Sequence, residues 1–374
     1  MIDWIDAIVP CHHRAEVVGG KIERTTSAGD VEWKKGLFRS VVGSFETGVQ
    51  LKTAWRSDTG ECTHLHVSGN LAKFFQGHNL WGSDDPGALV FEFMQWLVAY
   101  DVETSVLGLV PHAEDVQAWI TGEYRFTRID YTETFHLDTE ADVLAYLRAA
   151  EHTAHLAHRG RGQLCEGSTL YFGKHSRRWA LKLYAKGPEI RRNAESQPAI
   201  LRLPSAQQWA AKSLRCELVL RSMELKRRGL DRPRAWFVLQ ENGVQFDPSH
   251  LIREILGDMT MTTTLELSPD VLATLKPALR MAYLTWHAGA DLRTIHSKTA
   301  FYRYRAQLLP YGIDIATVQP RDLSHRSIAS VLVARPAEVP DWANGTPLFF
   351  EPRRPAVTPA LVRNCQLLWD RHAA

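Results

Sequence analysis

Long hydrophobic runs are missing from this chain of 374 residues. No apolar stretch reaches the ~18–20 residues that a membrane-spanning helix needs. The first residues, MIDWIDAIVPCHH, place Asp3 and Asp6 where a secretory signal peptide would have Lys or Arg. We therefore expect no membrane partner and a cytoplasmic location.

Paired cysteines are missing as well. The five cysteines are far apart, odd in number and without a CxxC pair, which excludes a disulfide framework or a zinc ribbon and indicates a reducing compartment. They are Cys11, Cys62, Cys165, Cys216 and Cys365. The sequence also has no internal repeat or low-complexity tract. Its hydrophobic content of 45% and charged content of 23% are typical of globular proteins.

The net charge of +2 hides an uneven distribution of charge. Residues 174–234 contain 16 Lys and Arg against 5 Asp and Glu, a local balance of +11 that leaves −9 for the rest of the chain. A basic middle in an acidic chain can be only a solvated face, but it also predicts a surface that binds a polyanion such as nucleic acid.

The basic segment contains a predicted β-hairpin, with strands at residues 169–173 and 179–186 joined by a turn at 174–178. Alternation places Lys182, Tyr184 and Lys186 on one face. Two ammonium groups beside a phenol lower the Tyr pKa and attract phosphate, so Tyr184 is a candidate covalent nucleophile for strand transfer. The alternative is an amphipathic strand with solvated lysines and a half-buried tyrosine.

Three further alternating strands are predicted at residues 62–68, 124–136 and 214–221. Each gathers ionisable residues on one face: His64 with His66, Arg128 with Asp130, and Arg215 with Glu217. A sheet with one solvated face gives the same alternation. Together with the hairpin, however, these strands supply the nucleophile, the hard ligands for Mg²⁺ or Mn²⁺ and the cations that metal-assisted phosphoryl transfer uses.

Helices are predicted at residues 87–100, 139–158, 223–230 and 271–286, and residues 69–85 and 195–207 are expected to be turns or loops. The sequence therefore predicts an α+β fold. Its central, largely antiparallel sheet has flanking helices and a nuclease site on one face, and a mainly helical C-terminal part follows. We place a catalytic domain at 1–232 and a DNA-binding or accessory domain with an extended tail at 233–374.

The segment 294–309 interleaves Arg303 and Arg305 with Phe301, Tyr302 and Tyr304. Such a segment can contact phosphates and stack on unpaired bases. Equally, it can form an amphipathic helix whose aromatic rings pack on the catalytic domain.

Five motifs carry a resemblance to a known family. They are HVSGNLAKFFQGHNLWG (66–82), TRIDYTETF (127–135), WALKLYAKGPE (179–189), LRCELVLR (214–221) and FYRYRAQLLPYGIDI (301–315). In this order they resemble the gene II-type replication initiators of filamentous phages over about residues 1–330. The QGHN and Y-x-K-x-x-E motifs are specific to that family.

The resemblance implies roles for individual residues. Tyr184 matches the nicking nucleophile, and Lys186 and Glu189 belong to the same motif. Asp130 and Glu217 match carboxylates of the family, while His66 stands where relatives often have Glu. The implied metal ligands for Mg²⁺ or Mn²⁺ are Asp130, Glu217, His66 and Glu189, and the implied catalytic cations are Lys182 and Lys186.

The resemblance also implies an activity, which is nicking and rejoining of double-stranded and single-stranded phage origin DNA through a 5′-phosphotyrosyl link in the bacterial host cytoplasm. The host polymerase and helicase are then partners. The expected DNA contacts are Lys73, His78, Arg128, Arg178, Arg191, Arg303 and Arg305. A DNA-binding regulator that does not cut, or a relaxase acting on plasmid DNA, are the alternatives.

Overall fold

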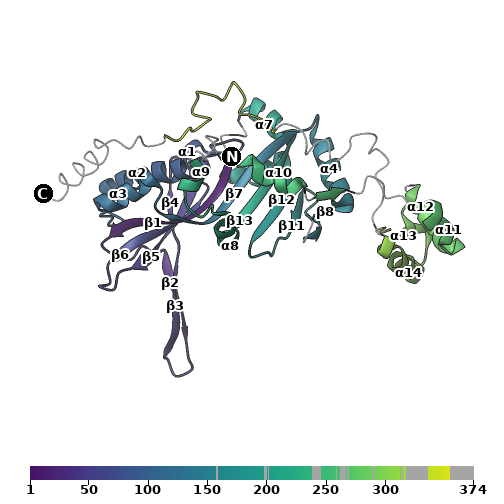
Figure 1. Cartoon of the computed structure of the whole chain (residues 1–374), viewed down its shortest axis with the longest axis horizontal. Helices are drawn as coiled ribbons and strands as arrows, with labels where there is room; N and C mark the ends of the chain where they lie inside the picture. The colour runs from purple at the N-terminus through teal and green to yellow at the C-terminus, as the bar shows by residue number, and fades with distance from the viewer. Residues whose placement is uncertain are drawn as a thin grey trace.

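We describe the fold from a computed structural model that covers residues 1–156, 159–197, 200, 202–237, 246–257, 259–261, 267, 269–288, 290–311, 313, 315–316 and 336–353. A nine-stranded sheet dominates this part of the chain (Figure 1). In sheet order its strands are β10 (Gln163–Cys165), β11 (Thr169–Phe172), β12 (Trp179–Ala185), β13 (Ser213–Arg221), β7 (Arg125–His136), β1 (Ile2–His13), β6 (Cys62–Gly69), β5 (Gly48–Arg56) and β4 (Arg39–Val42). Every neighbouring pair is antiparallel, as the sequence predicted.

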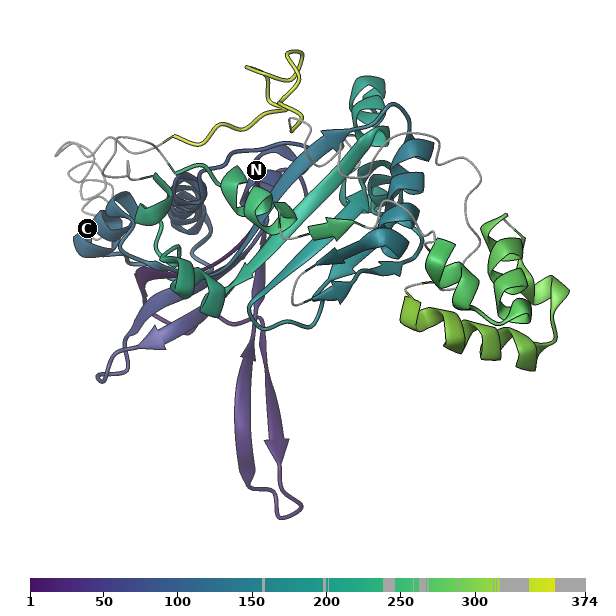
Figure 2. The same cartoon turned by 45° about the vertical axis from the view of Figure 1, so that its right-hand side comes forward.

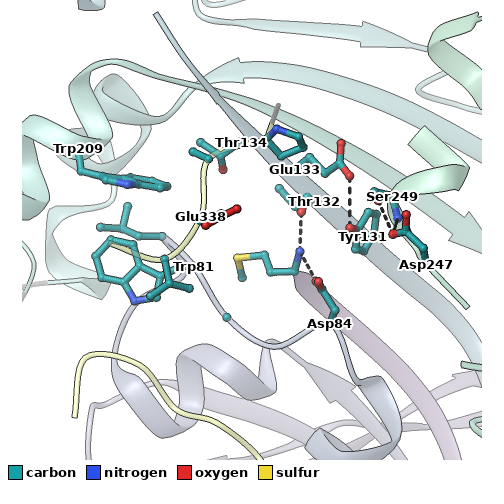
Figure 3. Close-up of a pocket in the computed structure, with 16 residues that line it drawn as sticks. Trp81, Asp84, Tyr131, Thr132, Glu133, Thr134, Trp209, Asp247, Ser249 and Glu338 are labelled. Carbon is teal, nitrogen blue, oxygen red and sulfur yellow. Dashed lines mark hydrogen bonds and ion pairs between the residues drawn. The ribbon is translucent and has the colours of Figure 1, made fainter. Parts of the chain in front are cut away.

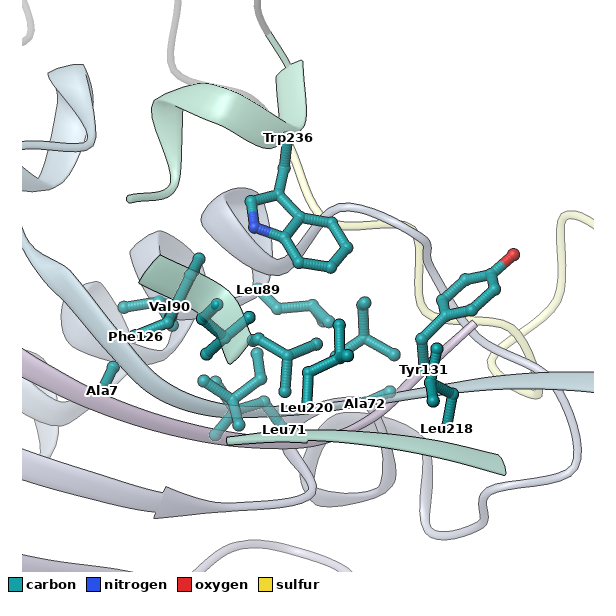
Figure 4. Packing of buried hydrophobic residues seen from close by; sticks show 14 of the residues in the cluster. Ala7, Leu71, Ala72, Leu89, Val90, Phe126, Tyr131, Leu218, Leu220 and Trp236 are labelled. Atoms are coloured by element: carbon teal, nitrogen blue, oxygen red, sulfur yellow. The ribbon is translucent and has the colours of Figure 1, made fainter. Parts of the chain in front are cut away.

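Alternation along the strands makes one face of the sheet apolar, and helices cover that face. Figure 4 shows Trp236 packing over Leu89 and Val90, with Leu218 and Leu220 of β13 in the same cluster. The helices that contribute buried side chains to this core are α1 (Leu71–Gln76), α2 (Pro86–Thr104), α3 (Ala113–Thr121), α4 (Glu140–Thr153), α8 (Ser222–Arg228), α9 (Arg234–Phe237) and α10 (Ser249–Gly257). The helix-covered face therefore leaves the other face free to carry polar groups.

Local sequence signals set the helix ends. The Asp85 side chain caps α2 by accepting hydrogen bonds from the backbone N–H groups of Gly87 and Ala88 at 3.1 and 3.0 Å. Thr139 and Asp142 form a capping box at the start of α4. Gly229 ends α8 in the left-handed conformation, with φ of 68°.

A two-stranded arm projects on the side of the sheet away from α2 and α3 (Figures 1 and 2). It is formed by β2 (Gly20–Thr25) and β3 (Val31–Leu37), which pair with each other and not with the large sheet. A second small sheet has the order β14 (Met259–Met261), β8 (Ala154–Leu156) and β9 (Gly160–Arg161).

The C-terminal helices have a hydrophobic core of their own, built around Leu279, Trp286 and Phe301. They are α11 (Pro269–Thr274), α12 (Pro277–His287), α13 (Leu292–Ile295) and α14 (Lys298–Leu308), followed by the short turn η2 (Leu309–Tyr311). The mainly helical C-terminal part is confirmed. Pro277 begins α12, so the single helix expected at 271–286 is two helices.

Residues 336–353 return to the sheet domain and pack on its top edge (Figure 2). The Ala337 N–H donates to the Thr134 carbonyl at 2.7 Å, and the Phe350 ring stacks on Phe75 with centroids 4.3 Å apart. The division at 232/233 remains a prediction. The sheet domain's core nevertheless extends past it, because Trp236 and Leu251 are buried there.

Two expected loops contain helices. α1 lies within 69–85, and α7 (Pro204–Ala211), preceded by α5 (Lys186–Arg192) and η1 (Ala194–Ser196), reaches into 195–207. The extended tail predicted at the end of the chain includes residues after 353, which lie outside the described residues. No helix among the described residues is both long and apolar enough to cross a bilayer.

Candidate nuclease site

The sheet register brings the polar residues of β6, β7, β12 and β13 to one face. Lys182 of β12 lies opposite Glu217 of β13, which lies opposite Thr132 of β7. Since directly paired residues share a face and alternate residues along a strand do too, Asp130, Glu217 and Lys182 lie on the same surface. The expectation that these strands present their ionisable groups together is met by the register.

Lys182 and Glu217 form the central ion pair of this face. The Lys182 Nζ lies 3.0 Å from Glu217 Oε2, and the same ammonium group stands 4.1 Å from the centre of the Tyr184 ring. Burial would lower the pKa of Lys182, but the Glu217 carboxylate raises it above its ordinary value, so Lys182 remains a cation. Lys182 therefore covers the ring of Tyr184 with a positive charge.

Asp130 is buried at 3% exposure and is held by Arg128 through two hydrogen bonds of 2.8 and 2.6 Å. Burial raises the pKa of Asp130 to about 7, although the hydrogen bonds from Arg128 act to lower it. Nearby Glu217 adds to the rise by like-charge repulsion. Asp130 is thus a carboxyl group that titrates near neutral pH.

Tyr184 differs from the expectation in one respect. Its side chain is only 3% exposed, and burial raises the pKa of the phenol well above its ordinary value, whereas the flanking lysines were expected to lower it. The ammonium groups of Lys182 and Lys186 lie 4.1 and 5.9 Å from the ring centre, and neither is among the main charges that act on the Tyr184 pKa. The largest charge acting to lower the Tyr184 pKa is Arg215, directly opposite on β13.

A buried polar network lies at this end of the face. Asp3 accepts hydrogen bonds from the side-chain amides of Asn70 and Asn79, at 2.8 and 2.9 Å. Asn79 Oδ1 in turn accepts from Lys186 Nζ at 2.7 Å. Burial lowers the pKa of Lys186 to about 8, although Glu189 lies 2.7 Å away. The network fixes α5, and with it the end of the Tyr184 strand.

Arg215 completes this network and is fully buried. Its guanidinium donates to the backbone carbonyls of Asn79 and Leu80 and lies 3.8 Å from Asp3 Oδ1. Burial works against the positive charge, but Tyr184 and Asp3 raise the pKa of Arg215. Arg215 is therefore a permanent charge beside the Tyr184 phenol.

His78 of the QGHN motif holds residues 336–353. The Leu80 N–H donates to His78 Nδ1 at 3.2 Å, so the proton is on Nε2, which donates to the Leu348 carbonyl at 2.8 Å. Burial lowers the pKa of His78 to about 4, and the ring is 1% exposed. His78 was expected to contact DNA, but no surface of the ring is left for a phosphate.

The other predicted DNA contacts occupy different positions. Arg178 is held by Glu224 at 3.0 Å and Arg191 by Glu140. Lys73 is half-buried, and burial lowers its pKa. Arg303 is exposed on α14, and Arg305 is half-buried on the same helix. Arg178 and Arg191 are thus each engaged by a carboxylate, and the contacts of these residues with DNA remain predictions.

A basic groove of about 550 Å³ lies at the hairpin turn, at the other end of the face from α5. Arg128 lines it together with Lys174, Arg177 and Arg221. Lys174 and Arg177 are exposed. Arg128 connects this groove to Asp130, so a phosphate backbone in the groove would reach the candidate site.

A second cavity of about 490 Å³ lies where residues 336–339 cross the sheet edge (Figure 3). Trp81 and Trp209 form one wall, with ring centroids 5.2 Å apart. Glu133 lies on the other side, and burial raises its pKa to about 7. The cavity is acidic and aromatic, so it is a poorer match for a polyanion than the groove beside Arg128.

The predicted metal ligands do not converge in this geometry. Asp130 and Glu217 lie on neighbouring strands but are each held by a cation, and Glu189 is paired with Lys186 in α5. Within the described ranges no three His, Cys, Asp or Glu side chains come together as a metal site. The part of this face that the structure describes therefore holds no preformed metal site, and Mg²⁺ or Mn²⁺ remains a prediction.

His66 lies apart from the two carboxylates. It aligns with Ile8 of β1, whereas Asp130 aligns with Trp4, four residues along the same strand. At 3.3 Å per residue this is roughly 13 Å along the sheet. His66 Nε2 is buried and has no hydrogen-bond partner among the described residues, and its neighbour His64 packs against Trp55.

The sequence reasoning missed Asp3 and Arg215 as site residues and gave Asn79 no defined role. Asp3 was considered only as a charge against a signal peptide, and Arg215 only as a member of an alternating strand. Of the three residues, only Arg215 gave a signal in the sequence, because it lies on the polar face of a predicted strand. A guanidinium that becomes buried needs several hydrogen-bond acceptors, so polar groups have to gather around it. None of the three can be identified without knowing which strands pair.

Comparisons with known proteins identify the family of the chain. Residues 1–238 match a family model for the N-terminal part of the phage replication-associated protein of the gene II type, and residues 269–348 match the model for its C-terminal part. The replication-associated protein of Enterobacteria phage I2-2 is 34% identical over 344 residues, which cover 91% of this chain and 95% of that protein.

A solved rolling circle replication initiator from Geobacillus stearothermophilus is 12% identical, covers 72% of this chain and 89% of its own, and gives a TM-score of 0.29. That score is too low to carry an argument about the site. The assignment rests on the two family models and the phage relative, which confirm the resemblance seen in the motifs. The chain belongs to the gene II-type replication-associated protein family and is a rolling-circle replication initiator, a nicking endonuclease that acts on phage origin DNA.

Proposed function

We propose that the initiator cuts one strand of the origin through the hydroxyl of Tyr184. The Tyr184 oxygen attacks the phosphorus, the bond from phosphorus to the 3′ oxygen breaks, and a 5′-phosphotyrosyl link forms. The phenol gives up its proton and the departing 3′ oxygen takes one, so a 3′-OH end is released. One phosphodiester is exchanged for another, and no ATP is needed.

The register between Tyr184 and Arg215 is the observation that supports this proposal most directly. Arg215 favours the phenolate against burial, and Lys182 stands over the ring beside the face where a phosphate would arrive. A fixed cation stabilises the negative charge that develops on the phosphoryl oxygens. An arriving phosphate would compete with Glu217 for the Lys182 ammonium group. Movement of Lys182 toward the phosphate would then uncover the ring of Tyr184.

The same reaction in reverse closes the circle. After one round, the new 3′-OH attacks the phosphotyrosyl link, and Tyr184 is released. In the host cytoplasm the first 3′-OH serves as a primer for the host polymerase, and a host helicase opens the duplex ahead of it. Asp130 and Glu217 are the carboxylates available to a divalent ion if Arg128 and Lys182 release them.

Formation of a covalent protein–DNA adduct tests this function. The full chain is incubated with origin DNA and Mg²⁺ or Mn²⁺, or with EDTA, and the products are separated on a denaturing protein gel. We expect an adduct with the metals and none with EDTA. Full adduct formation in EDTA would contradict the metal prediction but not the tyrosine. No adduct under any condition would contradict the proposed chemistry.

A further inference from the structure

The projecting arm of residues 20–37 has no role in the site described above. Strands of six and seven residues at 3.3 Å each reach roughly 20 Å, which is a large extension for two strands that bury no core. Ile22 and Trp33 are each 46% exposed and Leu37 is 40% exposed. An isolated ribbon with exposed apolar side chains is unfavourable in water unless something covers it.

The pairing register sorts the arm into two different faces. Ile22 lies opposite Lys35, and Arg24 lies opposite Trp33, so these four side chains share one face with Leu37. We call this the Trp33 face. No paired position on it carries a carboxylate, although Arg24 reaches Glu32 at 2.8 Å.

The other face of the arm is internally neutralised. Glu23 lies opposite Lys34, and their charged groups are 2.7 Å apart. Among the described residues, no carboxylate lies within ion-pair distance of Lys35. The adjacent lysines therefore lie on different faces of the arm. Lys34 is paired with Glu23, whereas Lys35 has no such partner among the described residues.

The base of the arm lies on the polar face of the sheet. Phe38, the residue after β3, packs edge-on against His66 with ring centroids 5.0 Å apart. The Lys52 ammonium stands 4.5 Å from the centre of the Phe38 ring. The arm therefore extends from the same surface that carries Asp130 and Lys182, on the side opposite the helices (Figure 2).

We propose that the Trp33 face binds unpaired DNA of the opened origin, next to the strand that is cut. This inference rests on the proposed function for its DNA substrate. Cations beside an exposed tryptophan suit a strand whose phosphates they contact and whose bases stack on the ring. A ribbon that reads the major groove would present hydrogen-bonding side chains, whereas Ile22 and Leu37 offer only apolar contact.

Binding measured without divalent ion tests the arm separately from cutting. The probe is a labelled duplex with a single-stranded tail, compared with the blunt duplex of the same sequence, and the protein is the full chain. Trp33→Ala should weaken binding to the tailed probe between about fivefold and about a hundredfold, the range for loss of one stacked base. Binding to the blunt duplex should change less than twofold. Trp33→Phe keeps a ring and should bind nearly as the wild type does.

The adjacent lysines give a matched control. Lys35→Ala should reduce the salt slope of binding to the tailed probe by about 0.7, the value for one phosphate contact on a single strand. Lys34→Ala, with the same loss of charge, should leave the slope unchanged. Equal thermal unfolding midpoints would show that the variants are folded.

Equal effects of the two lysine changes, or no effect of Trp33→Ala, would overturn the proposal. A larger loss on the blunt duplex would show a groove-reading ribbon instead. A concentration-dependent change in size without DNA, abolished by Trp33→Ala, would show that a second copy covers this face. Failure of the tyrosine chemistry would appear as absent adducts in every variant and would leave these binding ratios unchanged.

Discussion

Tyr184 and Arg215 lie directly opposite each other on β12 and β13, and both side chains are buried. Burial raises the Tyr184 pKa, and the Arg215 guanidinium is the strongest charge that lowers it. The phenolate of the proposed nucleophile Tyr184 would therefore depend on this one neighbour more than on the lysines of its own strand. The relationship gives a direct test.

Arg215→Gln should move the pH dependence of adduct formation to higher pH, because the phenolate loses the positive charge that lowers the Tyr184 pKa most. One unit of Tyr184 pKa corresponds to a tenfold loss of phenolate, so we expect at least about a tenfold lower rate at pH 7.5. Arg215→Lys keeps the charge and should lose less. Rates are measured from pH 7 to 10, below the unfolding temperature of each variant. An unchanged profile for the Gln variant would show that Arg215 only supports the fold.

Asp130→Asn tests the buried carboxyl. The folded-state pKa of Asp130 is about 7 and its ordinary value is 3.8, so the folded state binds the proton more tightly. The contribution of Asp130 to stability therefore falls as the pH rises from about 4 to about 7.

As the pH rises over that range, the free energy of unfolding of Asp130→Asn should increase relative to that of the wild type. The increase should be at most about 4 kcal/mol, which is the free energy that corresponds to the difference between the two pKa values. Urea unfolding of both proteins at pH 4.5, 6 and 8 measures the difference. If the difference in the free energy of unfolding is constant across these pH values, Asp130 is ionised throughout, held by Arg128.

His78 should make the attachment of residues 336–353 sensitive to acid. Its folded pKa of about 4 lies below the ordinary 6.5, so its contribution is present above pH 6.5 and is lost as the pH falls toward 4. His78→Ala should lower the free energy of unfolding by only ~1 kcal/mol at pH 7, since Trp81 also donates to the Leu348 carbonyl. The loss should be smaller at pH 4.5, because the wild type has by then lost part of the contribution of neutral His78.

The measurement for His78 is urea unfolding, together with proteolysis of residues 336–353. His175→Ala, in the exposed hairpin turn, is the control and should show neither effect. A pH-independent loss in His78→Ala would mean that packing alone, and not the neutral tautomer, holds the segment.

The fold was largely predictable from the sequence, because amphipathic strands and capped helices are local signals. Strand β13 and the start of α4 lie within one residue of the predicted positions. β12 ends at Ala185, one residue earlier than predicted, because Lys186 begins α5, and α8 ends at Arg228, two residues earlier than predicted. The helices α1 and α7 were missed, since each is short and is stabilised by tertiary burial.

The electrostatics of the site could not be predicted in the same way. Local spacing suggested that Lys182 and Lys186 lower the Tyr184 pKa, but Lys186 is drawn into the Asn79 network and burial outweighs both charges. The dominant partner, Arg215, is 31 positions away along the chain. The position of His78 under Leu348 depends on a contact across 270 residues.

The salt dependence of DNA binding should distinguish two adjacent arginines. Arg177 lines the open groove, whereas Arg178 is held by Glu224. Each phosphate contact on duplex DNA contributes about −0.9 to the slope of log K against log salt.

Arg177→Ala should therefore reduce the magnitude of the slope by about that amount, and Arg178→Ala should leave it unchanged. Fluorescence anisotropy with an origin duplex at several salt concentrations measures both. Equal changes would mean that Glu224 releases Arg178 to the DNA.

Mapping the covalent link tests the central claim most directly, with Tyr171 as an internal control. Tyr171 lies on the adjacent strand opposite Lys182, is half-buried, and so is more exposed to an arriving phosphate than Tyr184 is. The adduct formed by the wild-type chain is digested with nuclease and protease, and mass spectrometry locates the tyrosine that carries the nucleotide. Tyr184→Phe and Tyr171→Phe are compared in parallel for adduct formation and DNA binding. We predict the nucleotide on Tyr184, no adduct from Tyr184→Phe with binding nearly intact, and an adduct from Tyr171→Phe. A nucleotide on Tyr171, or an undiminished adduct from Tyr184→Phe, would contradict the account.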